Sequence, residues 1–298
     1  MLKKKEKRQS VASQYAKRTQ LGEIWHRLKK NKGAMVGLAI VVMFALIAIF
    51  ADVMFDYDTQ IAGYNLRAKL IKPCLEHPFG TDEMGRDLFA RLLYGTRYSM
   101  AIAFSSVLFG VCVGLPLGAM CGYLGGKFDL IAMRLLDILR SIPGILLGIV
   151  IVAWLGQSTL NLIIAIAVGM VPGMASTTRA AVLTVRNAEY VESARSIGIS
   201  EWRIVMVHIL PNCLSTILVQ TTLRVAGAII SASSLSFLGL GVPIPSPEWG
   251  ALLSAGRAYI RDASYLTMFP GMAIMILVLS LNLLGDGLRD ALDPKLRK

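Results

Sequence analysis

The stretch YSMAIAFSSVLFGVCVGLPLGAMCGYLGG, residues 98–126, contains no charged side chain and no histidine. About 20 apolar residues are enough for an α-helix to cross the roughly 30 Å hydrocarbon core of a bilayer. This stretch is longer than that, and it lies well inside the chain. It therefore predicts a transmembrane helix and, with it, a membrane protein.

Glycines recur at every fourth position here, at residues 110, 114, 118, 122 and 126, with Pro116 among them. Residues four apart share one face of a helix, and small residues on that face allow a second helix backbone to approach closely. We expect this face to be a packing seam. The alternative is a surface on which helices slide, with a kink at Pro116.

The composition agrees with a membrane protein. Of the 298 residues, 55% are hydrophobic and 17% are charged, whereas a soluble domain carries about 25% charged residues. The formal net charge of +12 is concentrated in residues 1–32, whose many Lys and Arg residues face only Glu6 and Glu23. Basic residues that flank a first span stay in the cytoplasm. This distribution of charge therefore predicts how the chain is oriented in the membrane, with residues 1–32 in the cytoplasm. It does not indicate nucleic-acid binding.

Cysteine and histidine spacing gives no sign of a metal centre. The four cysteines form no C-x-x-C pair, and the three histidines are far apart in sequence. Zinc sites and disulfide frameworks show characteristic spacings that are missing here. We expect no metal site in this chain.

Four further stretches with at most one charge predict the other spans. Residues 141–178 are too long for one span, because a straight helix of that length would run about 57 Å, and the polar break GQSTLN at 156–161 divides them. The predicted fold class is an all-α integral membrane protein with about six transmembrane helices. Its spans are 33–51, 98–126, two within 141–178, 210–241 and 263–285.

A cytoplasmic N-terminus and alternating spans assign the loops. Residues 52–97, 156–159 and 242–262 are expected outside, and residues 127–140 and 179–207 inside, with both chain ends cytoplasmic. The predicted segments are a basic cytoplasmic segment 1–32, a first span with its extracytoplasmic loop 33–97, a transmembrane core 98–288 with the inside loop 179–207, and a cytoplasmic tail 289–298.

The segment EYVESARSIGISEWRIVMVHILPN, residues 189–212, is charged where its neighbours are apolar. Its first part predicts a short helix that ends at Gly198, the residue type that a helix C-cap favours. Glu192 and Arg195 are three apart and are expected to pair. The apolar face of this helix is expected to hold Tyr190, Val191, Ala194 and Ile197.

A second helix is expected to start after Ser200, a suitable N-cap residue, and to lead into the membrane. Pro211 predicts a kink or a boundary before the next span. The polar face of the first helix is nearly balanced in charge, whereas helices that lie on lipid headgroups are usually rich in Lys and Arg. This favours docking into a groove on a protein partner; a lipid-surface helix is the alternative.

Residues 192–211 resemble a motif of a known family. "ESARSIG", followed nine residues later by "HILP", resembles the EAA motif of ABC importer permeases, although Ser193 replaces an alanine and His208 an isoleucine. The resemblance implies that the loop forms a coupling helix seated in a cleft on an ATPase subunit. The residues that it implies for docking and coupling are Glu189, Tyr190, Glu192, Ala194, Arg195, Gly198 and Pro211.

Three other blocks, at 79–99, 235–253 and 282–295, resemble the C-type permease subunits of dipeptide, oligopeptide and nickel importers. The resemblance runs from about residue 22 to the end. It implies a permease in the cell (inner) membrane that works by alternating access. The partners it implies are a second permease chain in a hetero-oligomer, two cytoplasmic ATP-binding subunits that hold ATP and Mg, and an extracytoplasmic substrate-binding protein.

The chain contains no G-x-x-x-x-G-K-[ST] motif, which is the phosphate-binding loop of many ATPases. This agrees with the implication that ATP is bound by partner subunits. We therefore expect no cofactor in this chain and no enzyme activity of its own. Di- or oligopeptides are the expected cargo. Nickel, glutathione or another small solute is an alternative within the family, and an ion-coupled secondary transporter is an alternative outside it.

Arg224 is the charge that lies well inside a predicted span. Arginine at a helix centre costs about 2.5–3.5 kcal/mol on insertion scales, so it should face the bundle or a water-filled path. A role with a peptide carboxylate, a structural pair and snorkelling are all open. Arg134, Asp137 and Arg140 are expected to pair locally on an inside helix extension.

Two outside blocks carry further candidates. His77, Asp82, Glu83 and Asp87 match no calcium or zinc spacing, and we expect a structural loop or a contact with the binding protein. Trp249 would suit either an interfacial anchor or a surface met by the binding protein.

Overall fold

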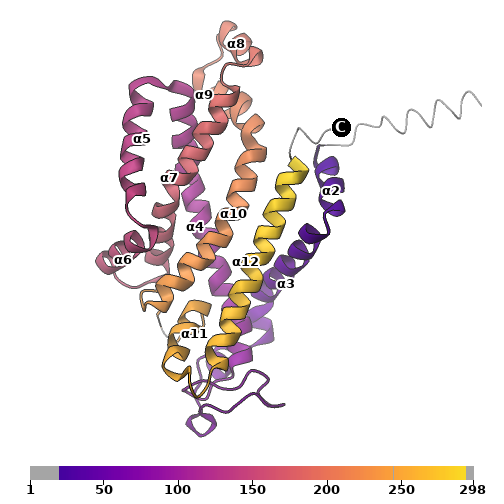
Figure 1. The fold of residues 1–298 in the computed structure, drawn as a ribbon, viewed down its shortest axis with the longest axis vertical. Coiled ribbons are helices and arrows are strands. Elements are labelled where there is room, and N and C mark those ends of the chain that lie inside the picture. The colour runs from indigo at the N-terminus through magenta and orange to yellow at the C-terminus, as the bar shows by residue number, and fades with distance from the viewer. Residues whose placement is uncertain (1–19, 244, 293–298) are drawn as a thin grey trace, which may run out of the picture.

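The computed structural model describes residues 20–243 and 245–292, and these residues are arranged as helices joined by short connections (Figure 1). Helices α8 and α9 lie at one end, which we call the α8 end. The connection at residues 57–87 lies at the other, which we call the loop end. The helices are α2 Gln20–Lys30, α3 Lys32–Met54, α4 Leu88–Leu124, α5 Gly126–Ser141, α6 Gly144–Leu155, α7 Thr159–Val185, α8 Glu189–Ser196, α9 Glu201–Arg203, α10 Leu210–Phe237, α11 Trp249–Gly256 and α12 Tyr265–Leu292, with the short helices η1 Tyr57–Ile61, η2 Leu66–Ala68, η3 Ile204–Ile209 and η4 Arg257–Tyr259.

Five of the described helices are long and apolar enough to cross a membrane. They are α3, α4, α7, the continuous helix Glu201–Phe237 and α12. A sixth span results if α5 and α6, which meet at 88°, are counted as one. The prediction of an all-α membrane protein with about six spans is confirmed.

The glycine face of α4 is a packing seam against α7. A Cβ atom built on Gly118 would lie 2.8 Å from the Ala175 Cα, and one on Gly122 would lie 2.9 Å from the Arg179 carbonyl oxygen. Contacts this close exist only because both positions lack a side chain. Gly126 does not belong to the seam: it starts α5, and a Cβ there would meet nothing within 4 Å.

Helix α4 begins ten residues earlier than the span predicted at 98. Asp87 caps it, because its Oδ1 accepts a hydrogen bond from the Ala90 amide at 2.8 Å. Arg91 and Arg97 lower the hydropathy of residues 88–97, so a search for apolar stretches does not detect this part of the helix. Part of the segment predicted as an outside loop is therefore helix.

The predicted third span differs most from the structure. Residues 127–140, expected in an inside loop, form α5, and the span expected from Ser141 is α6, which extends only about 18 Å. Pro143 causes the break, since the residue before a proline is pushed to extended backbone and Ile142 has ψ 125°. Two hydrogen bonds from Arg179 to Asp129, of 2.5 and 2.6 Å, tie α5 to α7.

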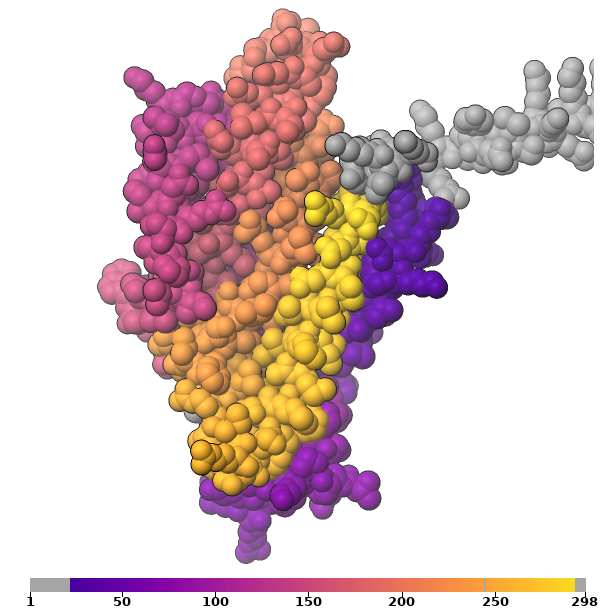
Figure 2. Space-filling view, in the orientation of Figure 1, coloured from indigo at the N-terminus to yellow at the C-terminus, as the bar shows by residue number. Residues whose placement is uncertain are grey.

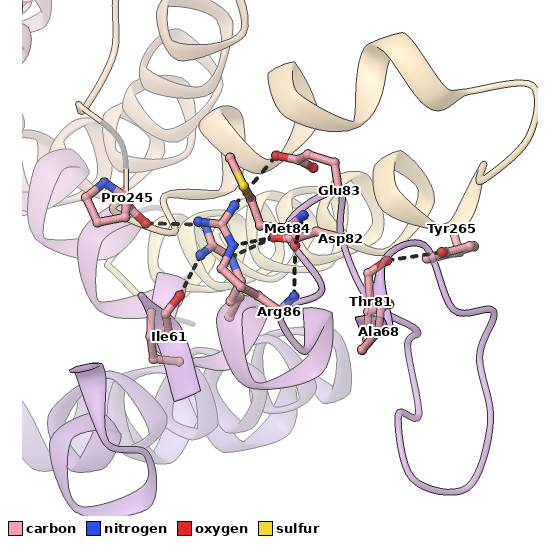
Figure 3. A network of polar contacts seen from close by, with 10 residues as sticks. Ile61, Ala68, Thr81, Asp82, Glu83, Met84, Arg86, Pro245 and Tyr265 are labelled. Carbon is pink, nitrogen blue, oxygen red and sulfur yellow. Dashed lines mark hydrogen bonds and ion pairs between the residues drawn. The ribbon is translucent and has the colours of Figure 1, made fainter. Parts of the chain in front are cut away.

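A buried ionic network fixes the loop end (Figure 3). Arg86 Nε donates to Asp82 Oδ2 at 2.7 Å, and both side chains are buried. Arg91 donates to the carbonyl oxygens of Ile61 at 2.6 Å and Pro245 at 3.3 Å. Buried charges persist when they are paired and hydrogen-bonded, so Asp82 is a structural residue of this loop.

Trp249 is fully buried, so it is neither an interfacial anchor nor an exposed surface for a partner. Its Nε1 donates to the Leu92 carbonyl oxygen at 2.9 Å, and its ring meets Phe44 edge-on with centroids 5.6 Å apart. The indole thereby joins α11 to α3 and α4. This burial follows from packing across distant segments, which the local sequence does not show.

Candidate functional site

Helix α8 projects at one end of the molecule (Figures 1 and 2). Its side chains form a buried face and an exposed face. Val191 and Ala194 are 0% and 5% exposed. Glu189, Tyr190 and Glu192 are exposed to solvent. A short helix that is anchored on one side and open on the other can present a surface to a partner.

The inner face seats α8 on the transmembrane bundle. Val191 and Ala194 belong to one buried cluster with Ile204, Val205 and Tyr123. Ala194, which the resemblance placed among the docking residues, therefore lies on the seat of the helix and not on its open face. Because Tyr123 belongs to α4, this cluster connects α8 to a transmembrane helix.

Gly198 ends α8 in the left-handed conformation, with φ +79°. The Ile199 amide donates to the Ala194 carbonyl at 3.2 Å, and the Gly198 amide donates to the Arg195 carbonyl at 3.0 Å. These two bonds form a Schellman motif, in which glycine is the favoured residue. Ile199 packs against the same buried cluster as Ala194.

Arg195 ties α8 to α4 and α9, and not to Glu192 as the spacing predicted. Its Nη2 donates to the Tyr123 hydroxyl oxygen at 2.9 Å, and its Nε lies 3.4 Å from Glu201 Oε1. The Tyr123 hydroxyl in turn donates to Glu201. The hydrogen bond with Tyr123 raises the pKa of Arg195 above its usual value.

Tyr123 is a residue of this site that the sequence did not reveal, because 72 positions separate it from Arg195. The sequence also did not reveal that two large apolar side chains are exposed on the open side of α8. Ile197, predicted on the inner face, is 77% exposed, and Trp202 is 60% exposed. Exposed large apolar side chains are typical of surfaces that contact another protein or a membrane.

Pro211 does not interrupt the helix that leads into the membrane. The π-helical segment Ile204–Ile209 continues directly into α10, and Pro211 lies in the first turn of α10, where it is exposed. A π-turn accommodates a proline because it shifts the carbonyl partners by one residue. Pro211 thus lies beside the site and outside α8. Arg224 lies farther along α10, half-buried.

We expect Tyr123→Phe to loosen α8 without unfolding the bundle, because the ring keeps its packing while the hydroxyl link to Arg195 and Glu201 is lost. Amide hydrogens of residues 189–200 should exchange about threefold faster, as measured by hydrogen–deuterium exchange mass spectrometry. Tyr64→Phe is the control, since Tyr64 is 76% exposed at the loop end. Unchanged exchange in Tyr123→Phe would contradict a role of the hydroxyl in holding α8.

Two models of known protein families match this chain. Residues 114–298 match the family model described as binding-protein-dependent transport system inner membrane component. Residues 19–73 match the N-terminal transmembrane domain of oligopeptide transport permease C. Together the two models cover most of the chain.

Relatives named as permeases match over nearly their full length. The dipeptide transport system permease protein DppC of Alkalihalophilus pseudofirmus is 45% identical, over 92% of this chain and 90% of the relative. DppC of Haemophilus influenzae is 41% identical, over 95% and 98%. The glutathione transport system permease protein GsiD of Escherichia coli O1:K1 / APEC is 43% identical, over 94% and 92%.

Among solved structures, the MetNI methionine ABC transporter in an inward-facing conformation has a chain with a TM-score of 0.58 to this one. The match covers 68% of this chain and 96% of the other, at 22% identity. At that identity the likeness concerns the fold alone.

Proposed function

The chain belongs to the binding-protein-dependent transport permeases, the membrane subunits of ABC importers, and on that premise we propose that its cargo is a di- or oligopeptide. Relatives named for dipeptides and for glutathione support this cargo, since glutathione is itself a small peptide. Glutathione is the second candidate because its named permease is 43% identical to this chain.

The observation that carries the mechanism is the two-faced helix α8. Its open face would sit in a cleft of an ATPase subunit, while Val191 and Ala194 join it to the bundle. ATP and Mg bound by two partner subunits would move α8, and α4 and α10 would follow it. Nucleotide shifts such an equilibrium only through its different affinity for the two states, so alternating access requires this mechanical link.

The same proposal gives the chain its orientation and neighbours. The α8 end would lie in the cytoplasm and the loop end outside, where a substrate-binding protein would deliver the cargo. In the inner membrane, a second, different permease chain would complete the translocation path. Arg224 would face this path. Both chain ends, predicted to be cytoplasmic, lie outside the described residues.

A cysteine crosslink tests the docking of α8. Ser193→Cys, in a background without the four native cysteines, is expected to crosslink to the ATPase subunit in a nucleotide-dependent way. Ser193 is exposed, and its hydroxyl donates to the Glu189 carbonyl of the same helix. The readout is the shifted band on a denaturing gel of the assembled transporter, with and without ATP.

The matched control is a variant that keeps only the native Cys74, which is exposed at the loop end. It should give no ATPase crosslink, and it should react with a membrane-impermeant maleimide in intact cells. If cysteines throughout residues 189–203 gave no crosslink, α8 would be a membrane-surface helix and the coupling proposal would fail.

A further inference from the structure

Arg224 is a cation in the interior of the bundle without an acidic partner among the described residues. Its guanidinium lies on α7, since a Cβ atom built on Gly173 would come within 2.9 Å of both terminal nitrogens. Its Nε is buried and has no hydrogen-bond partner within residues 20–243 and 245–292. An uncompensated buried charge is costly, and in membrane proteins such charges mark ion and substrate pathways.

Arg140 is a second cation of this part of the chain, and its side chain is exposed. Arg140 lies in the last turn of α5, about 20 Å along that helix from its first residue. The local pair with Asp137 that the spacing predicted does not form, and no ion pair to Arg140 occurs among the described residues. Arg140 is therefore, like Arg224, without an acidic partner within residues 20–243 and 245–292.

The space beside Arg224 is open on both helices that flank it. Gly227 lies three residues after Arg224 on α10, and Gly169 lies one turn from Gly173 on α7. Both are exposed, and a Cβ atom on either would meet no described atom within 4 Å. A ligand can therefore approach the guanidinium from the side that the bundle leaves free.

We propose that Arg224 binds the carboxylate of the transported peptide and so selects cargo with a free carboxyl terminus. The inference rests on the proposed peptide cargo. A guanidinium group matches a carboxylate by paired, charge-assisted hydrogen bonds, and a carboxylate beside Arg224 would compensate its buried charge. Anionic lipid offers the same oxygen chemistry, and the experiment separates the two sources.

The test uses the complete transporter with its partner subunits in nanodiscs. Gly227→Cys, in a background without the native cysteines, places a thiol at the open position beside Arg224. The measured quantity is the rate of its reaction with a small maleimide, in the presence of millimolar Ala-Ala or the C-terminal amide of Ala-Ala. We expect the acid to slow the labelling and the amide to leave it unchanged.

Adding Arg224→Gln should raise the concentration of Ala-Ala needed for half-protection about tenfold, and Arg224→Lys should retain part of the preference for the acid. Arg134→Gln removes the same charge from α5, two turns before Arg140, and should change nothing. Equal protection by acid and amide, or full protection by Ala-Ala in Arg224→Gln, would overturn the proposal. So would protection by phosphatidylglycerol nanodiscs, relative to phosphatidylcholine ones, without protection by Ala-Ala, since the site would then hold lipid.

A parallel measurement separates this inference from the proposed function. ATP-dependent uptake of Ala-Ala or Ala-Ala-Ala by the transporter with its binding protein, without any protection of the thiol, would refute the anion site alone. If neither peptide nor glutathione were taken up, the proposed peptide cargo would be wrong, and the carboxylate site would fall with it.

Discussion

Gly198→Trp is expected to abolish peptide uptake and substrate-stimulated ATP hydrolysis while the permease still inserts into the membrane. The glycine holds φ +79° at the end of α8, and a side chain in the left-handed region costs about 1–2 kcal/mol. A Cβ there meets nothing within 4 Å among the described residues, so the new side chain would start in open space, where a docked partner would meet it. Losses of about 2 kcal/mol or more at an interface centre correspond to at least about 30-fold weaker binding.

The control is Gly156→Trp. Gly156 has φ +88° and equally open surroundings, but it lies in the connection between α6 and α7, away from α8. Gly156, with ψ 165°, lies in a region that essentially only glycine occupies, so its substitution is expected to cost at least as much backbone strain. Only Gly198 is at the proposed docking surface. Glu192→Arg, which reverses a charge on the open face, should also lose coupling. Normal uptake by both Gly198→Trp and Glu192→Arg would remove α8 from the coupling mechanism.

The second large effect is expected at the seam between α4 and α7. Gly118→Ala places a methyl group 2.8 Å from the Ala175 Cα, and a backbone atom cannot move aside as the end of a side chain can. Overpacking of this kind costs about 1–3 kcal/mol. We expect much less assembled permease in the membrane and a lower midpoint of thermal unfolding in detergent.

Two alanine variants provide a graded comparison. At Gly110 the nearest atom to a new Cβ is the Met170 Cβ at 3.3 Å, and at Gly169 there is none within 4 Å. Stability should fall in the order Gly169→Ala, Gly110→Ala, Gly118→Ala, with Gly169→Ala close to the unsubstituted protein. Equal effects at all three positions would mean that helix propensity, and not the seam, determines the outcome.

The sequence predicted the membrane helices because hydropathy is a local property that needs no knowledge of contacts. It failed where a span is not uniformly apolar. The start of α4 was missed because Arg91 and Arg97 look exposed in sequence, whereas Arg91 is 3% exposed and bonded to Ile61 and Pro245. Helix α5 was assigned to a loop because its charged residues end a hydropathy window, although Asp129 pairs with Arg179 across the bundle.

The candidate site was predicted in outline for a similar reason. The helix, its glycine and its charged face follow from neighbouring residues, so the motif at 189–198 was sufficient to expect them. The contacts that hold the helix come from elsewhere in the chain. Arg195 contacts Tyr123 and Glu201 instead of the predicted Glu192. Tyr123 is distant in sequence, so only the fold brings it next to Arg195. The docking role of the open face stays a prediction.

The break at Ser141–Pro143 bears on how the cell controls the amount of this protein. Irregular backbone at membrane depth is tolerated only where protein covers it or where it lines water. In this chain residues 140–146 are exposed, so the break has to line water or be covered by another molecule. If the second permease chain of the proposed assembly covers it, a newly made copy without that chain would display a flaw that membrane quality control can recognise. Its lifetime would then be short, and degradation of orphan copies would keep the permease subunits at equal numbers.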